Sequence, residues 1–186
     1  MRFGLLRTAA LGTIVFAFIG TQSVSAAPVK DGSRDFDFEI GTWKTHLKRL
    51  KNPLSGAAPA WVEYDGTSVV SKILDGRANL VELRVTGSAG TIEGLSLRLY
   101  EPEGQQWTLN FVSMRDGKLS TPAIGAFENG RGTFYGQDSL GGKAIFVRFV
   151  IQPSSADAIH FEQAFSADGG KSWEVNWIAD DVRAKG

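Results

Sequence analysis

Short runs in which apolar and polar residues alternate, each followed by a turn signal, constrain this chain most strongly. A period of two places successive side chains on opposite faces of a strand, so each run predicts a β-strand. No segment shows a convincing helical period. The alternating sets are Trp43-Thr45-Leu47, Val81-Leu83-Val85, Leu95-Leu97-Leu99, Trp107-Leu109-Phe111, Ile145-Val147-Phe149-Ile151, Ile159-Phe161 and Trp173-Val175-Trp177.

The turn signals between these runs are of the hairpin type, because each offers a residue that adopts positive φ readily. They are Asp75-Gly76, Asp116-Gly117, Asn129-Gly130, Gly141-Gly142 and Asp168-Gly169-Gly170. Less regular strands are predicted over 61–73 and 124–135. Locally connected antiparallel strands favour an up-and-down barrel, since closure removes unpaired edges, and a two-sheet β-sandwich is the alternative.

The N-terminal residues have the pattern of a secretory signal peptide. Arg2 and Arg7 form a basic region, an apolar run covers 11–20, and small residues end at Ala26. The apolar run is shorter than the roughly 20 residues that span a bilayer. We therefore predict a signal peptide over 1–26, a flexible lead-in over 27–35 and a single barrel domain over 36–183. The protein is then exported to the periplasm or the extracellular medium, with no stable membrane insertion after cleavage.

The chain contains no cysteine, which excludes disulfides, a thiol nucleophile and a lipid-modified cysteine anchor. Without Arg2 and Arg7 the basic residues number 18 against 20 acidic ones, a formal charge of −2. Nothing in this balance favours nucleic acid as a partner. The 160 residues after Ala26 suffice for one unassisted core, and the oligomeric state is left open.

Gly41-Thr42-Trp43 opens the first predicted strand and resembles the entry strand of the calycins, which include lipocalins and fatty-acid-binding proteins. That resemblance implies a tryptophan packed across the closed end of a barrel, often beneath an arginine from the last strand. Arg183 is the nearest candidate for this arginine, and Gly41 and Trp43 are then structural residues. The implied fold is all-β, a single antiparallel, up-and-down, lipocalin-like barrel of about 8 to 10 strands.

Three longer segments resemble a group of uncharacterised bacterial secreted proteins with lipocalin-like barrels. This resemblance covers nearly the whole chain after the signal peptide, and it implies the fold without transferring an activity. The segments are 37–43, 93–100 and 161–174.

Residues 166–173 fit the Asp-box pattern, Ser-x-Asp-x-Gly-x-Ser-Trp, and resemble a repeated hairpin of sialidases and other propellers. The pattern occurs once here, whereas propellers need several blades. The aspartate can instead fold back onto the turn amides while the tryptophan packs under the hairpin. We therefore interpret Asp168, Gly170 and Trp173 as structural residues.

Several polar residues share the register of the richer apolar set of their strand and are predicted to face the barrel interior. One interpretation is a structural plug near a barrel end; the other is a set of groups that orient a ligand in an apolar pocket. The candidate ligand-binding residues are Trp61, Glu63, Asn79, Glu93, Trp107, Phe111, Ser113, Arg115, Gln163 and Trp177. Arg49 has the same register, and Glu93 could pair with Arg115.

Patterns for catalysis are weak, and no catalytic residue is assigned. His46 and His160 fall on predicted outward faces, and His160 with Glu162 supplies too few ligands for a metal site. The chain has neither a Gly-x-Ser-x-Gly elbow nor a phosphate-binding loop. Asp180 and Asp181 are predicted to be solvated. No cofactor or metal is predicted.

Three functions remain open from the sequence. The leading one is an exported barrel that binds a small, partly apolar ligand. The second is a small barrel enzyme of the isomerase or hydrolase type, with Glu93 and Arg115 as the first residues to test; we regard an enzyme as the less favoured reading. The third is a non-catalytic interaction protein with a filled barrel.

Overall fold

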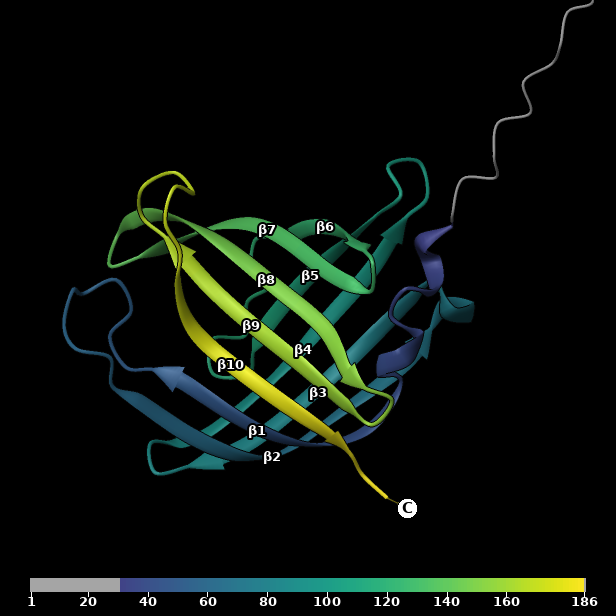
Figure 1. Ribbon diagram of the computed structural model, residues 1–186, viewed down its shortest axis with the longest axis horizontal. Helices are drawn as coiled ribbons and strands as arrows, with labels where there is room; N and C mark the ends of the chain where they lie inside the picture. The colour runs from purple at the N-terminus through teal and green to yellow at the C-terminus, as the bar shows by residue number, and fades with distance from the viewer. Residues whose placement is uncertain (1–30, 186) are drawn as a thin grey trace, which may run out of the picture. The chain divides into compact units, whose positions relative to one another are not determined.

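A computed structural model describes residues 31–185, which form ten antiparallel strands in a closed barrel (Figure 1). Each strand pairs with the next in sequence, and the last pairs with the first, so the predicted up-and-down barrel is confirmed. The strands are β1 (Gly41–Leu50), β2 (Trp61–Ile73), β3 (Ala78–Gly87), β4 (Gly90–Glu101), β5 (Gln106–Ser113), β6 (Ala123–Glu128), β7 (Arg131–Leu140), β8 (Lys143–Ser155), β9 (Ala158–Ser166) and β10 (Glu174–Arg183).

Three short 3₁₀ turns accompany the strands: η1 (Gly32–Arg34), η2 (Asp37–Glu39) and η3 (Leu74–Gly76). The predicted signal peptide lies outside the described residues. Within 31–185 there is no helix with the length and apolar character needed to cross a membrane.

Two predicted hairpins show why the chain reverses so tightly. Asn129 and Gly130 have φ values of 50° and 80° between β6 and β7, and Gly141 and Gly142 have φ values of 58° and 78° between β7 and β8. Two consecutive residues with positive φ are the requirement of a type I′ turn, whose twist matches that of paired strands.

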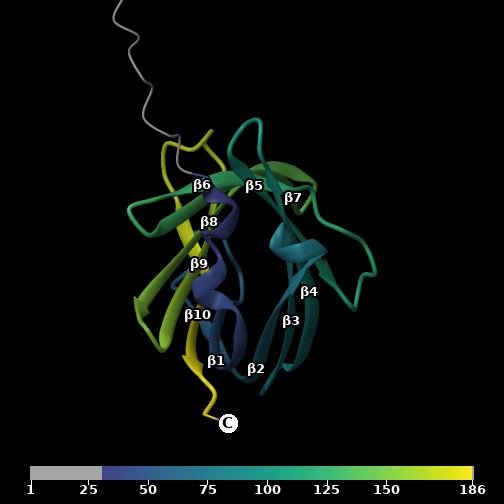
Figure 2. The same cartoon turned by 90° about the vertical axis from the view of Figure 1, so that its right-hand side faces the viewer.

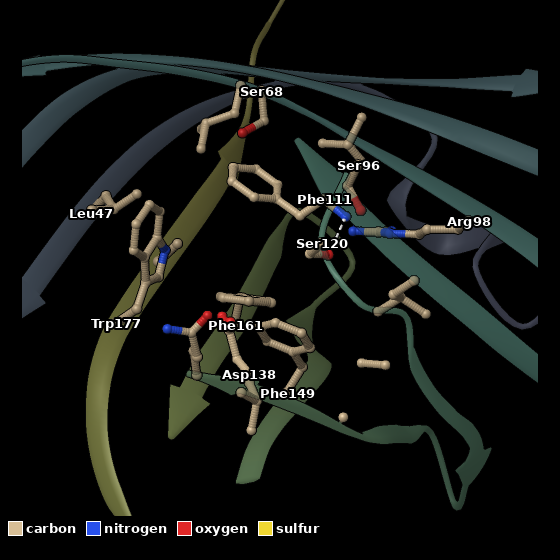
Figure 3. A pocket seen from close by; sticks show the side chains of 18 of the residues that line it. Leu47, Ser68, Ser96, Arg98, Phe111, Ser120, Asp138, Phe149, Phe161 and Trp177 are labelled. Atoms are coloured by element: carbon tan, nitrogen blue, oxygen red, sulfur yellow. Dashed lines mark hydrogen bonds between the residues drawn. The ribbon is translucent and has the colours of Figure 1, made fainter. Parts of the chain in front are cut away.

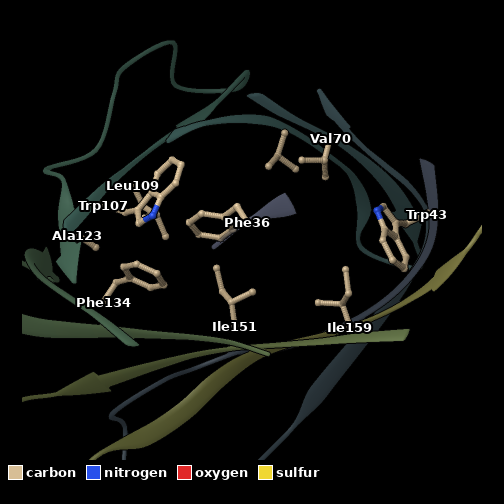
Figure 4. Packing of buried hydrophobic residues seen from close by; sticks show 10 residues of the cluster. Phe36, Trp43, Val70, Trp107, Leu109, Ala123, Phe134, Ile151 and Ile159 are labelled. Atoms are coloured by element: carbon tan, nitrogen blue, oxygen red, sulfur yellow. The ribbon is translucent and has the colours of Figure 1, made fainter. Parts of the chain in front are cut away.

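The segment before β1 crosses one end of the barrel (Figure 2). Phe36 is buried and contacts Trp107 edge-to-face at 4.9 Å between ring centroids, with Phe134 beside it (Figure 4). The Phe127 ring also contacts Phe36 edge-to-face, at 4.8 Å between ring centroids. Of the predicted lead-in, the structure describes residues 31–35, which include the turn η1. There Gly32 is buried, its N–H donates to the Tyr100 hydroxyl and its carbonyl accepts from Trp107 Nε1. The polar sequence of this segment does not predict its hydrogen bonds with Tyr100 and Trp107.

Trp43 lies at the same end, where β1 meets β10. The guanidinium of Arg183 covers its ring, and the Arg183 terminal nitrogens donate to the carbonyls of Ile40 and Phe38 at 3.1 Å. Trp43 Nε1 donates to the Glu39 carbonyl at 2.7 Å. The arrangement that the calycin resemblance implied, a tryptophan beneath an arginine of the last strand, is therefore present.

The contact between β5 and β6 is the shortest in the barrel. Only three residue pairs, from Trp107–Gly125 to Leu109–Ala123, are in register between these strands. Beyond them, the β5–β6 loop folds back, with Val112 bridged to Leu119 and Ser120 N–H donating to the Phe111 carbonyl at 2.7 Å. On the other side, residues 136–140 of β7 pair with β8 alone. The barrel wall is therefore sparsely connected here.

Candidate functional site: a cavity with aromatic walls and an acidic floor

The half of the barrel away from Phe36 is hollow, with a cavity of about 210 Å³ (Figure 3). All ten strands contribute to its lining, and the large apolar side chains come from β1, β3, β5, β8, β9 and β10. Because apolar side chains dominate the lining, a bound molecule would gain from burial of its own apolar surface. The principal wall residues are Leu47, Leu83, Phe111, Phe149, Phe161, Phe165 and Trp177.

A chain of polar groups forms the cavity floor. Thr45 Oγ1 donates a short hydrogen bond to Asp181 Oδ1, and Ser68 Oγ lies 2.7 Å from the same threonine oxygen. Thr45 has one hydroxyl proton, which it gives to the carboxylate, so Ser68 must donate to Thr45. All three residues are buried, and all three line the cavity. The chain thus directs hydroxyl dipoles at Asp181.

Burial is the largest influence on the Asp181 carboxyl and raises its pKa to about 6. The Thr45 hydrogen bond opposes this shift, while the negative charge of Glu39 adds to it. Asp181 is 8% exposed. No described residue donates a hydrogen bond to its second oxygen, Oδ2, so one oxygen of this cavity-lining carboxylate lacks a donor within 31–185.

A buried ion pair separates the cavity from the filled end. Arg98 Nη2 donates to Glu39 Oε1 at 3.1 Å, and Nη1 makes a shorter contact with Oε2. The guanidinium lies over the Phe36 ring, 4.4 Å from its centroid. Both side chains are more than nine-tenths buried, and Arg98 Nε has no hydrogen-bond partner within 31–185. Arg98 is therefore committed to Glu39, and the two charges cancel.

The polar residues Ser120, Thr121, Gln137 and Asp138 line the cavity where β5 and β6 are poorly paired. Gln137 and Asp138 are exposed, as are Ser120 and Thr121. Exposed residues in the lining mark this side as the route by which the cavity meets solvent. Asp138 brings a second carboxylate to that opening.

Three of the predicted ligand-binding residues line the cavity: Phe111, Gln163 and Trp177. Gln163 Nε2 donates to Asn176 Oδ1 at 2.7 Å, which fixes its amide. Arg49 lies near the end of β1, and its guanidinium carbon is 5.8 Å from the Trp177 ring centroid.

Four other candidates lie away from the cavity. Trp107 belongs to the packed cluster around Phe36. Asn79 is buried with no hydrogen-bond partner for Oδ1 among the described residues. Trp61 is 37% exposed, at the start of β2. Ser113 ends β5, and its Oγ accepts from Arg115 N–H at 3.3 Å in the following turn.

The predicted inward direction of Glu63, Glu93 and Arg115 is wrong. Glu63 faces outward beside Lys48, Glu93 is paired with Arg84 at 2.8 Å on the outer surface, and Arg115 is exposed in the β5–β6 loop. The predicted Glu93–Arg115 pair is replaced by this cross-strand contact.

The error on β4 has a physical cause in its neighbour β5. Phe111 projects over Gly94, where an added Cβ would lie 2.5 Å from the Phe111 ring. Small or paired residues must therefore face inward on β4, and the inward set is Gly94, Ser96 and Arg98. The leucines of β4 face outward, and Leu99 is 38% exposed. On β4, therefore, the alternate positions with more apolar residues face outward and not toward the barrel interior.

Sequence reasoning missed the floor of the cavity. Asp181 was predicted to be solvated, but it is buried beside Thr45. One available signal was the register of Thr45 with Trp43 and Leu47. The other was the register of Asp181 with Arg183, two residues along β10.

The Asp-box hairpin is held by Asp168, whose Oδ1 accepts from the N–H groups of Lys171 and Ser172 at 3.0 Å. The Ser172 hydroxyl donates to Oδ2 at 2.6 Å. Hydrogen bonds led by those from Ser172 hold the pKa of Asp168 well below its usual range. Trp173 Nε1 donates to the Gly170 carbonyl at 3.0 Å. Both carboxylate oxygens of Asp168 therefore accept hydrogen bonds from within the turn.

The two histidines lie on the outer surface, each beside carboxylates. His46 Nδ1 is 2.8 Å from Asp65, and His160 contacts Asp180 at 2.7 Å and Glu162 at 3.1 Å. Partial burial disfavours charged His160, but the two carboxylates outweigh it and raise its pKa. Within 31–185 no group of three or more such side chains has metal-binding geometry.

Neither a family model nor a curated protein matches this chain. Among solved structures, an S-type phycobiliprotein lyase from Guillardia theta superposes with a TM-score of 0.57 at 12% identity, over 84% of this chain and 94% of that one. A de novo designed fluorescence-activating β-barrel covers 84% of this chain and 100% of its own at 14% identity, with a TM-score of 0.42. A redesigned barrel bound to DFHBI covers 83% and 100%, at 11% identity and the same score. The likeness to the lyase establishes the barrel fold.

Proposed function

We propose that this protein is an exported carrier that holds a small, partly apolar ligand inside its barrel. The observation that carries the proposal is the cavity of about 210 Å³, which has aromatic walls and a buried carboxylate with one unpartnered oxygen. A few convergent polar groups in an otherwise apolar pocket are the usual arrangement of a small-molecule site.

The division of the barrel into a filled half and a hollow half supports a carrier over a filled interaction protein. Around Phe36 the aromatic rings contact one another closely, and buried side chains fill the space. Beyond the Glu39–Arg98 pair, the same barrel leaves a volume that no side chain occupies. A cavity of this size costs stability, because its lining atoms lose packing contacts. Occupation by a ligand would recover part of that loss.

The enzyme alternative is weakened by the positions of the residues on which it depended. Glu93 and Arg115 lie outside the cavity, so they cannot act together on a molecule bound within it. Glycan binding gains no support from the Asp-box, because Asp168 is occupied by its own turn. The barrel fold shared with the phycobiliprotein lyase supports the carrier proposal, because a closed barrel can enclose a ligand cavity.

The test begins with the protein purified natively from the periplasm or the medium, followed by native mass spectrometry for a retained small molecule. Ser96→Leu places a larger side chain in the cavity, whereas Ser71→Leu makes the same change at an exposed position of β2. We expect the first variant to lose the bound mass and the second to keep it. Absence of any retained molecule would count against the carrier function.

A second readout uses Trp177, which among the described tryptophans alone lines the cavity. A bound ligand should change its fluorescence, and Trp177→Phe should remove that change. Trp173→Phe, in the Asp-box hairpin, should leave it intact. A response that survives Trp177→Phe would place binding elsewhere.

A further inference from the structure

We propose that the cavity selects ligands with a positively charged nitrogen, and that an arylalkylamine is the chemical class that fits it. The proposal rests on the carrier function above and specifies the charge and size of its ligand. It follows from four observations: the charge of the lining, the free oxygen of Asp181, the aromatic walls and the volume.

The lining carries an excess of negative charge. Its ionisable side chains are Glu39, Arg98, Asp138 and Asp181. Glu39 and Arg98 neutralise each other in a two-point ion pair. Two carboxylates remain, one at the floor and one at the opening, and no other lysine, arginine or histidine lines the cavity within the described residues. An anionic ligand would meet these carboxylates without a cation to receive it.

The floor carboxylate is arranged for a ligand that donates hydrogen bonds. Ser68 donates to Thr45 and Thr45 to Asp181 Oδ1, which stabilises the ionised carboxylate on one side. Oδ2 receives no such donor within 31–185. A buried carboxylate is costly unless a charge or several donors compensate it. An ammonium group at Oδ2 would supply both.

The aromatic walls of the cavity also favour a positively charged ligand. Phe111, Phe149, Phe161 and Trp177 enclose the space beside the floor (Figure 3). The face of an aromatic ring attracts cations, and the attraction strengthens where water is excluded. The walls would therefore stabilise an ammonium group and also pack against an aromatic ring of the ligand.

Arg98 would be the natural receptor for a carboxylate ligand, and its contacts argue against that use. Both terminal nitrogens are bound to Glu39, and Nε is buried from solvent and from the cavity. An anion could reach this guanidinium only by breaking the ion pair. A neutral ligand could enter, but it would leave Asp181 without a counter-charge.

The volume limits the ligand to one ring and a short arm. A cavity of about 150 Å³ accepts benzene, and the cavity here is about 210 Å³. The difference accommodates two or three further heavy atoms. A single aromatic ring with an aminoethyl arm is of this size, and the arm allows the nitrogen to reach Asp181 while the ring meets the phenylalanines.

Isothermal titration calorimetry at pH 7.5 with three probes of similar size provides the test: 2-phenylethylamine, its neutral isostere 2-phenylethanol and the anion 3-phenylpropionate. We expect the amine to bind at least tenfold more tightly than the alcohol, and the anion to bind more weakly than both. Asp181→Asn should remove the advantage of the amine and change the affinity for the alcohol less than threefold. Asp180→Asn, the adjacent change on the outer face, should preserve the advantage.

The outcomes separate this inference from the carrier function. Equal binding of amine and alcohol by the unmodified protein, or an advantage that survives Asp181→Asn, would overturn cation selection while leaving the cavity as a binding site. Tighter binding of 3-phenylpropionate would have the same consequence. Failure of all three probes, together with no retained molecule in the native protein, would overturn the carrier function and this inference with it. The comparison within the unmodified protein does not depend on any variant folding.

Discussion

The guanidinium carbon of Arg183 lies 4.1 Å from the centroid of the Trp43 indole, so the last strand of the barrel is held onto the first by a cation–π contact. The same arginine also caps the Phe38 and Ile40 carbonyls, and Trp43 is 1% exposed. One side chain therefore links the N-terminal segment, β1 and β10 at the point where the barrel closes.

Arg183→Met should destabilise the protein by about 2 kcal/mol, because it removes the cation–π contact and two hydrogen bonds to carbonyls. Urea unfolding followed by circular dichroism measures this loss. Arg131→Met is the matched control, since Arg131 is exposed and its side chain donates a hydrogen bond to Gln152. An equal effect of the two changes would show that the closure contact contributes nothing of its own.

Arg98→Met should destabilise the fold by about 3–5 kcal/mol, because it leaves the Glu39 carboxylate buried without its cation. Adding Glu39→Met should restore part of that loss, since the double change removes both charges. Chemical denaturation of the two single variants and the double variant completes a mutant cycle. Strictly additive losses would contradict the coupling expected from their two-point contact.

Asp181→Asn should change the free energy of unfolding more favourably at pH 7.5 than at pH 4. Burial raises the pKa of Asp181 to about 6 in the folded protein, above the 3.8 of an exposed aspartate. The folded state therefore pays an ionisation cost that is absent below about pH 4, develops between pH 4 and 6, and is complete above about 6. The variant removes this cost, at most about 3 kcal/mol. Unfolding midpoints across that range, compared with Asp180→Asn, would reveal the difference, and parallel curves would count against a raised pKa.

Asp168→Asn should lower the melting temperature at neutral pH while leaving ligand binding unchanged. The pKa of Asp168 is depressed by its hydrogen bonds, so its ionised form stabilises the fold above about pH 4 and this contribution falls away as the pH drops further. Thermal melts at pH 7 and pH 3 should show a gap between variant and parent that narrows in acid. Loss of ligand binding with an unchanged melting temperature would instead assign Asp168 to a site.

The barrel could be predicted because hairpin turns and period-two runs are local signals. Asn129-Gly130 and Gly141-Gly142 specify their turns by backbone conformation alone. The Trp43–Arg183 contact spans most of the chain, and its prediction came from a resemblance, since spacing does not specify so distant a contact.

The cavity floor was harder to predict because direction within a barrel depends on the neighbouring strand. Ser96 and Arg98 face inward because Phe111 occupies the space above Gly94. This steric relation joins β4 to β5 and is invisible in the β4 pattern. Asp180 and Asp181 were predicted to be solvated because adjacent strand residues face opposite sides and so do not form a catalytic pair. The place of Asp181 beside Thr45 follows instead from the register of β1 with β10.

The short β5–β6 contact affects how the barrel moves. Every other neighbouring pair of strands is joined by at least five residue pairs in register, whereas β5 and β6 share three. Local separation there breaks few backbone hydrogen bonds, so we expect its free energy to lie below that of global unfolding. Amide hydrogens around Phe111 and Ser120 should exchange with solvent while those of β2 and β3 remain protected. A molecule could then enter and leave on the timescale of this local opening, with the ring of paired strands otherwise intact.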